Sequence, residues 1–287
     1  MKKASTFSFV TLKAFGDYVI AYSSLRGCIA ASSHVVGSHL RELAVAIDPR
    51  WQPVFINHHE QSVPAAFDVK KRGFTKAACS MLELQKAISQ LPQDNVLVFD
   101  RWTWREKLLA AGRLATCLPP APNIYSAYDA FLRSHELPCI ASSSLRPITQ
   151  RPKGSKVRIF ASSRLEKKKI PLALCEELIC ALAQRGEEAE LVVLENEYPA
   201  LEAMRLPKLI LPKSFKGMVD CVAGSKSVIS ADSLPAHIAE IKGLRPVVVS
   251  PIDNSYWLPQ TSFHSGAWSL FEDGVSGILD AIDRTAG

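Results

Sequence analysis

Apolar and polar positions alternate along the chain in two recurring ways. Short apolar runs, bounded by polar residues or glycine, are typical of strands that are buried on both faces. Longer segments between them carry apolar residues at helical spacing. The short runs predict strands at residues 6–12, 42–47, 63–69, 95–100, 157–161, 190–195, 208–211, 227–230 and 246–249. The longer segments predict helices at residues 18–31, 76–91, 102–117, 171–185, 216–224, 274–286 and between Ser233 and Gly243.

This regular alternation predicts parallel sheets whose faces are covered by helices. It is interrupted between residues 138 and 156, where serine, proline and basic residues replace the apolar pattern, and we interpret this segment as a linker. The expected fold class is therefore α/β, with two Rossmann-like domains facing each other across a cleft. The first domain is expected to cover residues 1–150 and the second residues 151–287.

One stretch of the second half, residues 227–249, combines a strand, a polar turn, a helix and a second strand. Ser233 is placed to cap the helix, and Pro235 suits its first turn. Asp232, Ser233 and His237 meet at the carboxyl end of the first strand, where parallel sheets place their ligands. The N–H groups and the positive dipole end of the helix point at the same space, so the stretch predicts a binding site for an anion.

The first half offers a similar turn after its first strand. Gly16 and Asp17 lie between the strand and the helix-like segment that follows. A glycine allows the backbone to approach a ligand closely, and Asp17 is expected at or near the N-terminus of a helix. Two interpretations stay open at this stage, because the carboxylate can face a ligand or can simply cap the helix.

Composition and charge exclude several classes of protein. The chain has 287 residues, of which 47% are hydrophobic, and no apolar run approaches the ~20 residues that span a bilayer. The first residues do not form a secretory signal, and the 7 cysteines are scattered without a CxxC pair, so we expect a cytoplasmic protein with reduced thiols. Fingerprints of dinucleotide-binding, P-loop and common hydrolase sites are missing, as is the ligand spacing of a metal site.

The formal net charge is +6, and basic residues cluster at residues 70–76 and 167–169. Such clusters form a solvated face or attract an anionic partner, either an acidic membrane surface or a phosphorylated substrate. Nucleic acid is not expected, because no nucleic-acid-binding motif is present.

Three segments together resemble a known family. They are Lys13 to Asp17 after the first strand, Ser162 to Pro171 after the first strand of the second half, and Asp232 to His237. Their order and spacing are similar, over nearly the whole chain, to those of the ADP-heptose:lipopolysaccharide heptosyltransferases of glycosyltransferase family 9. The resemblance implies a GT-B fold. It also implies inverting, metal-independent transfer of a heptose or related sugar from a nucleotide diphosphate sugar, with an ADP-sugar expected, to a lipopolysaccharide or other envelope glycan.

The resemblance assigns roles residue by residue. Asp17 matches the family's catalytic base, which takes the proton of the acceptor hydroxyl as that oxygen attacks the anomeric carbon. Positions of the donor site are matched by Gly16, Ser162, Ser163, Lys167, Lys168, Glu195, Asp232, Ser233, Leu234 and His237. An extra residue before Pro171 leaves open whether Lys167 or Lys168 contacts the diphosphate, and Glu195 is matched to the ribose neighbourhood.

Departures from the family pattern are concentrated in the donor segments, where Leu234 replaces a glycine and Ile170 a tryptophan. An alternative is therefore a non-catalytic GT-B protein that binds a nucleotide sugar, or serves as a scaffold, in polysaccharide assembly. Expected partners are the sugar donor, a lipid-linked or lipopolysaccharide acceptor and the anionic inner membrane surface, with residues 70–76 as its contact.

Overall fold

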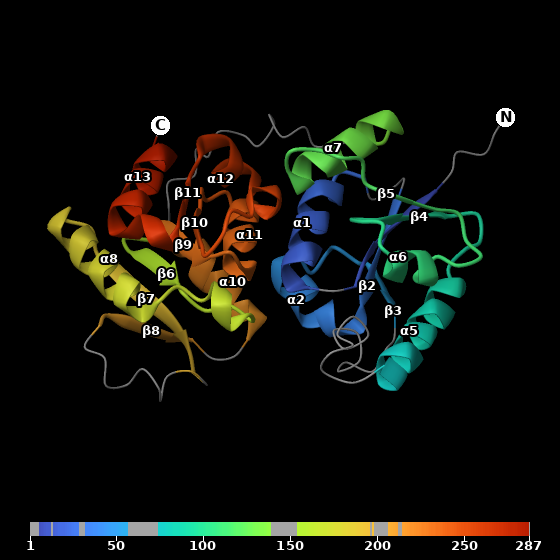
Figure 1. The fold of residues 1–287 in the computed structure, drawn as a ribbon, viewed down its shortest axis with the longest axis horizontal. Helices are drawn as coiled ribbons and strands as arrows, with labels where there is room; N and C mark the ends of the chain where they lie inside the picture. The colour runs from blue at the N-terminus through green and yellow to red at the C-terminus, as the bar shows by residue number, and fades with distance from the viewer. Residues whose placement is uncertain are drawn as a thin grey trace. The chain divides into compact units, whose positions relative to one another are not determined.

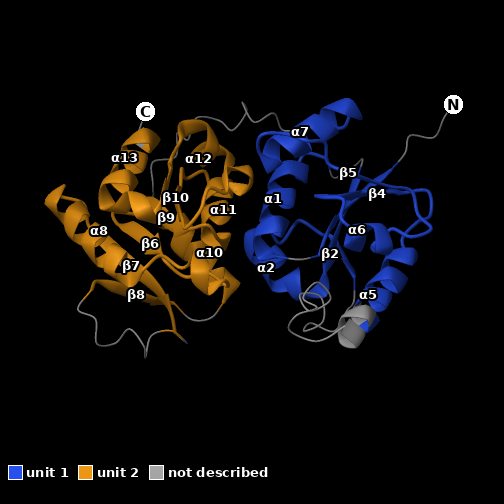
Figure 2. Cartoon of the chain, in the orientation of Figure 1, with its two compact units in different colours: residues 1–142 blue, residues 143–287 orange. Residues whose placement is uncertain are grey.

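A computed structural model of the chain describes residues 6–12, 14–28, 32–56, 74–138, 154–195, 197, 206–211 and 214–286. The chain divides into two compact units, residues 1–142 and 143–287 (Figure 2). The sequence expectation placed the boundary after residue 150. Most of the expected linker, the strand expected at residues 63–69 and the basic residues 70–72 lie outside the described residues.

Unit 1 contains a five-stranded sheet in the order β3-β2-β1-β4-β5, and every pairing is parallel (Figure 1). Its elements are β1 (Phe7–Thr11), α1 (Phe15–Leu25), β2 (Ser32–Gly37), the 3-10 helix η1 (Ser38–Leu40), α2 (Arg41–Ile47), β3 (Val54–Ile56), α5 (Phe74–Ser89), β4 (Val96–Phe99), α6 (Trp104–Leu109), β5 (Ala115–Cys117) and α7 (Ile124–Ser134).

The sheet of unit 1 is covered on both faces because successive strand residues point in opposite directions. Val10 of β1 joins a core formed with α5 and α6, which includes Leu84 and Leu109. Its neighbour Phe9 points to the other face and contacts Phe131 of α7 edge to face. The carboxyl ends of the strands therefore emerge between two helical layers.

Unit 2 contains a six-stranded parallel sheet in the order β11-β10-β9-β6-β7-β8. Its elements are β6 (Val157–Phe160), η3 (Glu166–Lys168), α8 (Leu172–Gln184), β7 (Ala189–Leu194), β8 (Lys208–Leu211), α10 (Phe215–Ala223), β9 (Ser227–Ala231), α11 (Leu234–Ile241), β10 (Val247–Ser250), η4 (Ser255–Trp257), α12 (Gln260–Ser265), β11 (Trp268–Leu270), η5 (Phe271–Asp273) and α13 (Gly274–Ala286).

Both faces of this sheet are also buried. Val247 and Val249 of β10 pack with α8 and α13 in one core, whereas Val248 between them packs with Ala236 of α11 on the opposite face. The same alternation explains why β10 reads as an uninterrupted apolar run in the sequence. The fold class expected from the sequence, α/β with two Rossmann-like units, is confirmed.

Two sequence expectations in unit 1 were wrong. Residues 42–47 form most of helix α2, in which Leu43, Ala44 and Ile47 are buried at helical spacing while Val45 is exposed. Residues 102–117 do not form one helix, because the chain turns after α6 and pairs again with β4 as β5. The strand next to β1 is instead β2, whose two leading serines concealed it.

We expect a buried leucine of α8 to matter far more for folding than an exposed leucine of the same helix. Leu178 is fully buried in the core of unit 2, whereas Leu172 is 36% exposed. Leu178→Ala should lower the free energy of unfolding by about 2–5 kcal/mol, because it leaves a cavity. Urea unfolding of the full chain measures the change, with Leu172→Ala as the matched control. Equal effects of the two variants would contradict the placement of α8.

Candidate functional site

The candidate site of unit 2 lies where the order of strands reverses. β6 and β9 are hydrogen-bonded neighbours, but the chain continues from β6 to β7 on one side and from β9 to β10 on the other. The connections that leave the two strands therefore diverge, which keeps the space beyond their carboxyl ends free of a crossing connection. The loop after β6 carries Lys168, and the turn after β9 carries Asp232.

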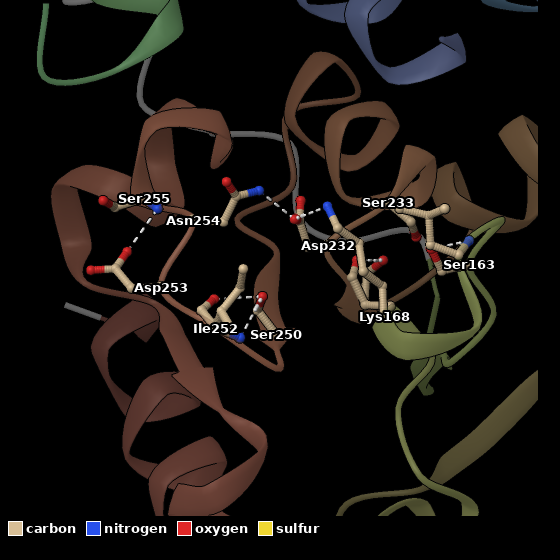
Figure 3. Close-up of polar contacts among 12 residues, drawn as sticks. Ser163, Lys168, Asp232, Ser233, Ser250, Ile252, Asp253, Asn254 and Ser255 are labelled. Carbon is tan, nitrogen blue, oxygen red and sulfur yellow. Dashed lines mark hydrogen bonds and ion pairs between the residues drawn. The ribbon is translucent and has the colours of Figure 1, made fainter. Parts of the chain in front are cut away.

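These two residues form an ion pair (Figure 3). Lys168 Nζ lies 2.6 Å from Asp232 Oδ2, and the same oxygen accepts a hydrogen bond of 2.6 Å from Nδ2 of Asn254, which follows β10. The side chain of Asp232 is only 7% exposed and that of Lys168 is 22% exposed. An ion pair this sheltered adds little net stability, because both charges have lost most of their hydration. It does hold a positive charge in place at the sheet edge.

The geometry separates the three consecutive lysines of this loop. Lys168 turns toward Asp232, Lys167 is exposed, and Lys169 pairs with Glu166 at 2.9 Å. Of the two lysines that the sequence left as alternatives, Lys168 is thus the one that lies beside Asp232. Asn254 was not identified from the sequence, because it follows a different strand and no motif marks it.

Helix α11 begins at Leu234, two residues after Asp232. Ser233 occupies its N-cap position, but the side chain makes no capping hydrogen bond and instead donates to the carbonyl oxygen of Ser162 at 3.3 Å. Within the first turn Pro235 has no N–H, and the N–H of Ala236 donates to the carbonyl oxygen of Ser233 at 3.2 Å. The N–H of Leu234 and the positive end of the helix dipole are therefore what this turn offers to an anion. Leu234 is the first helical residue, with right-handed backbone geometry, so the backbone at this position does not require a glycine.

His237 lies one turn further along α11 and is buried. Burial lowers its pKa from the usual 6.5 to about 4; the Asp232 carboxylate opposes this shift and the Lys168 ammonium adds to it. The imidazole is consequently neutral near pH 7. It can orient neighbouring groups by hydrogen bonding but adds no positive charge to the site.

Ser162 connects the site to the end of β7. Its hydroxyl donates a hydrogen bond of 2.6 Å to Oε2 of Glu197, while Ser163 accepts a weaker contact from the backbone of Leu165. Glu195, the residue matched from the sequence, is exposed at the end of β7. Glu197 is the carboxylate that reaches the site. Sequence reasoning missed it because it follows the strand end by three residues, beyond the reach of the strand pattern.

Gly16 and Asp17 belong to unit 1, in the first turn of α1 rather than in the turn before it. The N-cap residue Ala14 has no side chain that can cap the helix, and Asp17 supplies the negative charge that favours a helix N-terminus. The side chain is partly exposed. Unit 1 also has a reversal of strand order, because β1 lies between β2 and β4, and Asp17 lies just beyond β1 at that point.

A buried histidine fixes the turn that carries Asp17. Nε2 of His34 lies 3.1 Å from Oγ1 of Thr11, the last residue of β1, and the imidazole stacks on the ring of Tyr18 at 5.3 Å with an interplanar angle of 8°. Thr11 precedes the turn and Tyr18 follows Asp17, so His34 contacts both sides of it. Burial lowers the pKa of His34 to about 3, which keeps the ring neutral.

Among the described residues, no group of three or more histidine, cysteine, aspartate or glutamate side chains is placed to hold a metal ion. Within the same residues no helix is long and apolar enough to cross a membrane.

Comparison with solved structures identifies the fold. A family 9 glycosyltransferase from Veillonella parvula aligns over 100% of this chain and 97% of its own, with a TM-score of 0.64 and 12% identity. Heptosyltransferase WaaC of E. coli, solved with ADP, aligns over 97% and 98% with a TM-score of 0.62 and 12% identity. E. coli ADP-heptose lipopolysaccharide heptosyltransferase II aligns over 98% of both chains with a TM-score of 0.59 and 11% identity. No protein-family model and no curated protein sequence matches this chain. The likeness shows a GT-B glycosyltransferase fold.

We expect the two buried histidines to make the protein sensitive to mild acid. Their pKa values are lower in the folded chain than the usual 6.5, so below pH 6.5 the unfolded chain binds more protons. Stability is thus fully present above pH 6.5 and falls on acidification, by up to about 1.4 kcal/mol per pH unit for each histidine. Urea unfolding between pH 5 and pH 7 measures this slope.

The variant His34→Gln keeps a hydrogen-bonding group but removes one of these titrations. It should flatten the slope relative to the wild type, and His264→Gln, at an exposed position, is the matched control. An unaltered slope in His34→Gln would show that His34 is not buried as a neutral ring.

Proposed function

We propose that this protein is an inverting, metal-independent glycosyltransferase that moves a heptose or related sugar from a nucleotide diphosphate sugar to lipopolysaccharide or another envelope glycan. The observation that carries the proposal is the sheltered Lys168–Asp232 pair beside the uncapped N-terminus of α11, in a chain with the GT-B fold. The inverting reaction type is inferred from the match between Asp17 and the family's catalytic base.

Lys168 and the first turn of α11 are the proposed binding groups for the donor diphosphate. Lys168 presents a positive charge, and the turn presents the N–H of Leu234 and the positive end of the helix dipole, at the carboxyl edge of β6 and β9. As the bond to the sugar breaks, negative charge builds up on the departing diphosphate, and fixed donors of this kind stabilise it. In the structure the ammonium of Lys168 is paired with the carboxylate of Asp232. A bound diphosphate would either share this ammonium with the carboxylate or take the place of the carboxylate as its partner.

The nucleoside is proposed to lie toward the end of β7. Carboxylates commonly accept hydrogen bonds from both ribose hydroxyls, and Glu197 is the carboxylate that Ser162 orients there. We therefore assign to Glu197 the role that the sequence suggested for Glu195. The E. coli neighbour WaaC was solved with ADP, which supports an ADP-sugar as the first donor to test.

Asp17 is the proposed catalytic base. Its carboxylate would take the proton from the acceptor hydroxyl while that oxygen attacks the anomeric carbon and the diphosphate departs from the opposite face. This single displacement inverts the anomeric configuration and needs only one carboxylate. His34 serves this chemistry indirectly by fixing the turn that carries Asp17.

A panel of ADP- and UDP-sugars, read by thermal shift, tests the donor site. A ligand that binds only the folded chain raises the melting temperature, and at a fixed ligand concentration the shift increases with affinity. We expect an ADP-sugar to give the largest shift and Lys168→Met to weaken its affinity at least about ten-fold, since a charge-assisted contact is worth about 1.5–3 kcal/mol. Calorimetric titration provides the affinities.

Lys167→Met is the matched control, because it removes the same charge from the neighbouring exposed position. Its donor affinity should stay within about two-fold of wild type. If both lysine variants lose affinity equally, the diphosphate does not bind beside Asp232. If no nucleotide sugar binds at all, the scaffold alternative replaces the enzyme.

The variant Asp17→Asn tests catalysis separately from binding. It should lower the rate of nucleoside diphosphate release in the presence of acceptor glycan by about 10²–10⁴-fold, because the base is lost, and leave donor affinity unchanged. The exposed carboxylate Glu42 of α2 provides a control as Glu42→Gln, which should be fully active. Normal turnover by Asp17→Asn would rule out the proposed base.

A further inference from the structure

An aromatic and basic surface lies at α6 of unit 1. Trp104 is 58% exposed, Trp102 is 38% exposed and Leu108 is 38% exposed. Trp104 and Leu108 are four residues apart on α6 and therefore lie on the same side of the helix, and Trp102 immediately precedes it. We call Trp102, Trp104 and Leu108 together with Arg101, Arg105 and Lys107 the α6 surface.

The exposure of these side chains follows from the packing of α6. The helix turns its other side to the sheet, where Leu109 joins the core with α5. Glu106 is buried, and its carboxylate accepts a hydrogen bond from the backbone N–H of Thr103 at 3.0 Å in a capping box. This box fixes the start of the helix and hence the direction of Trp104. Trp104 and Leu108 lie on one outward face, and Trp102 directly before the helix is exposed as well, although its ring lies 5.9 Å from that of Phe99. Exposed apolar side chains this close together are unusual for a surface that contacts only water.

The net charge of the α6 surface comes from Arg105 and Lys107. Glu106 is buried in the capping box, and Asp100 forms an ion pair with Arg101 at 3.4 Å, which makes that pair neutral. The guanidinium of Arg105 lies 5.4 Å from the centre of the Trp104 ring, and Lys107 is exposed on the next turn. Indole rings accompanied by basic groups match the boundary between lipid headgroups and acyl chains, where tryptophan is enriched and anionic lipids attract lysine and arginine.

We propose that the α6 surface docks on an anionic lipid bilayer. Trp102, Trp104 and Leu108 would enter the headgroup region, and the basic residues would contact lipid phosphates. A lipid surface fits better than a carbohydrate, since Leu108 adds an aliphatic side chain that has no polar atom for a sugar hydroxyl but suits the acyl boundary.

The position of the surface relates it to the proposed chemistry. α6 follows β4, which pairs with β1, and β1 leads to Asp17. Docking through α6 would bring this edge of unit 1 to the membrane, where a lipid-linked acceptor resides. That interpretation rests on the proposed function, whereas the binding to lipid does not.

Co-sedimentation of the full chain with vesicles tests the proposal. We expect binding to mixed phosphatidylcholine–phosphatidylglycerol vesicles that is much weaker with phosphatidylcholine alone and decreases with salt. The variant W104Q/L108Q, which changes only exposed positions, should reduce binding at least about ten-fold. Brominated lipid should quench the tryptophan fluorescence of the wild type, and it should quench that of the variant less.

The matched control is Leu114→Gln, which removes an apolar side chain that is 66% exposed outside the α6 surface, and it should bind vesicles like the wild type. Thermal shifts with nucleotide sugars should be unaltered in all variants, so a failure of the donor proposal and a failure of this one are distinguishable. Unchanged vesicle binding in W104Q/L108Q overturns the proposal, as does binding that depends only on residues 70–76. A fluorescence change on adding a soluble anionic oligosaccharide, without vesicle binding, would identify the surface as a glycan platform instead.

Discussion

The reversal of strand order in each parallel sheet determines where this protein can do chemistry. In unit 2 the reversal lies between β6 and β9, and in unit 1 it lies next to β1. The connections diverge at these points, and side chains that follow the strands gather there. Lys168, Asp232 and Asn254 follow three different strands, yet Lys168 and Asn254 both donate to the same carboxylate oxygen of Asp232. The sequence separation of these residues is large, and only the sheet brings them together.

A part of the fold could be predicted from the sequence when its cause lies in neighbouring residues, and not when it lies in residues distant along the chain. Strands buried on both faces read as apolar runs, so β6, β7, β8, β9 and β10 were predicted nearly to the residue. The turn after β9 was also predictable, because Ser233 and Pro235 have strong preferences for the start of a helix. In contrast, residues 42–47 are short and apolar, and a run of that length suits a strand or a helix until its packing partners are known.

The side-chain network of the site was only partly predictable for the same reason. Asp232 and Lys168 were found because they belong to recognisable segments. Asn254, Glu197 and His34 were not, since each acquires its role through a contact with a residue from another strand end. Leu234, where the family has a glycine, is the first residue of α11 in the structure. How closely a phosphate can approach the backbone at this position is a question for the donor-binding measurements.

The pairing of Lys168 with Asp232 also links the binding of a ligand at the site to the protonation of His237. Asp232 raises the pKa of the buried His237 and Lys168 lowers it, so the two members of the pair act on that ring in opposite directions. An anion that draws Lys168 away leaves the carboxylate as the dominant neighbour and adds negative charge of its own, and both effects increase the proton affinity of His237. If an anion binds as proposed, its binding and proton uptake at this sheet edge are thermodynamically coupled, and the coupling grows as the pH falls toward the pKa of His237.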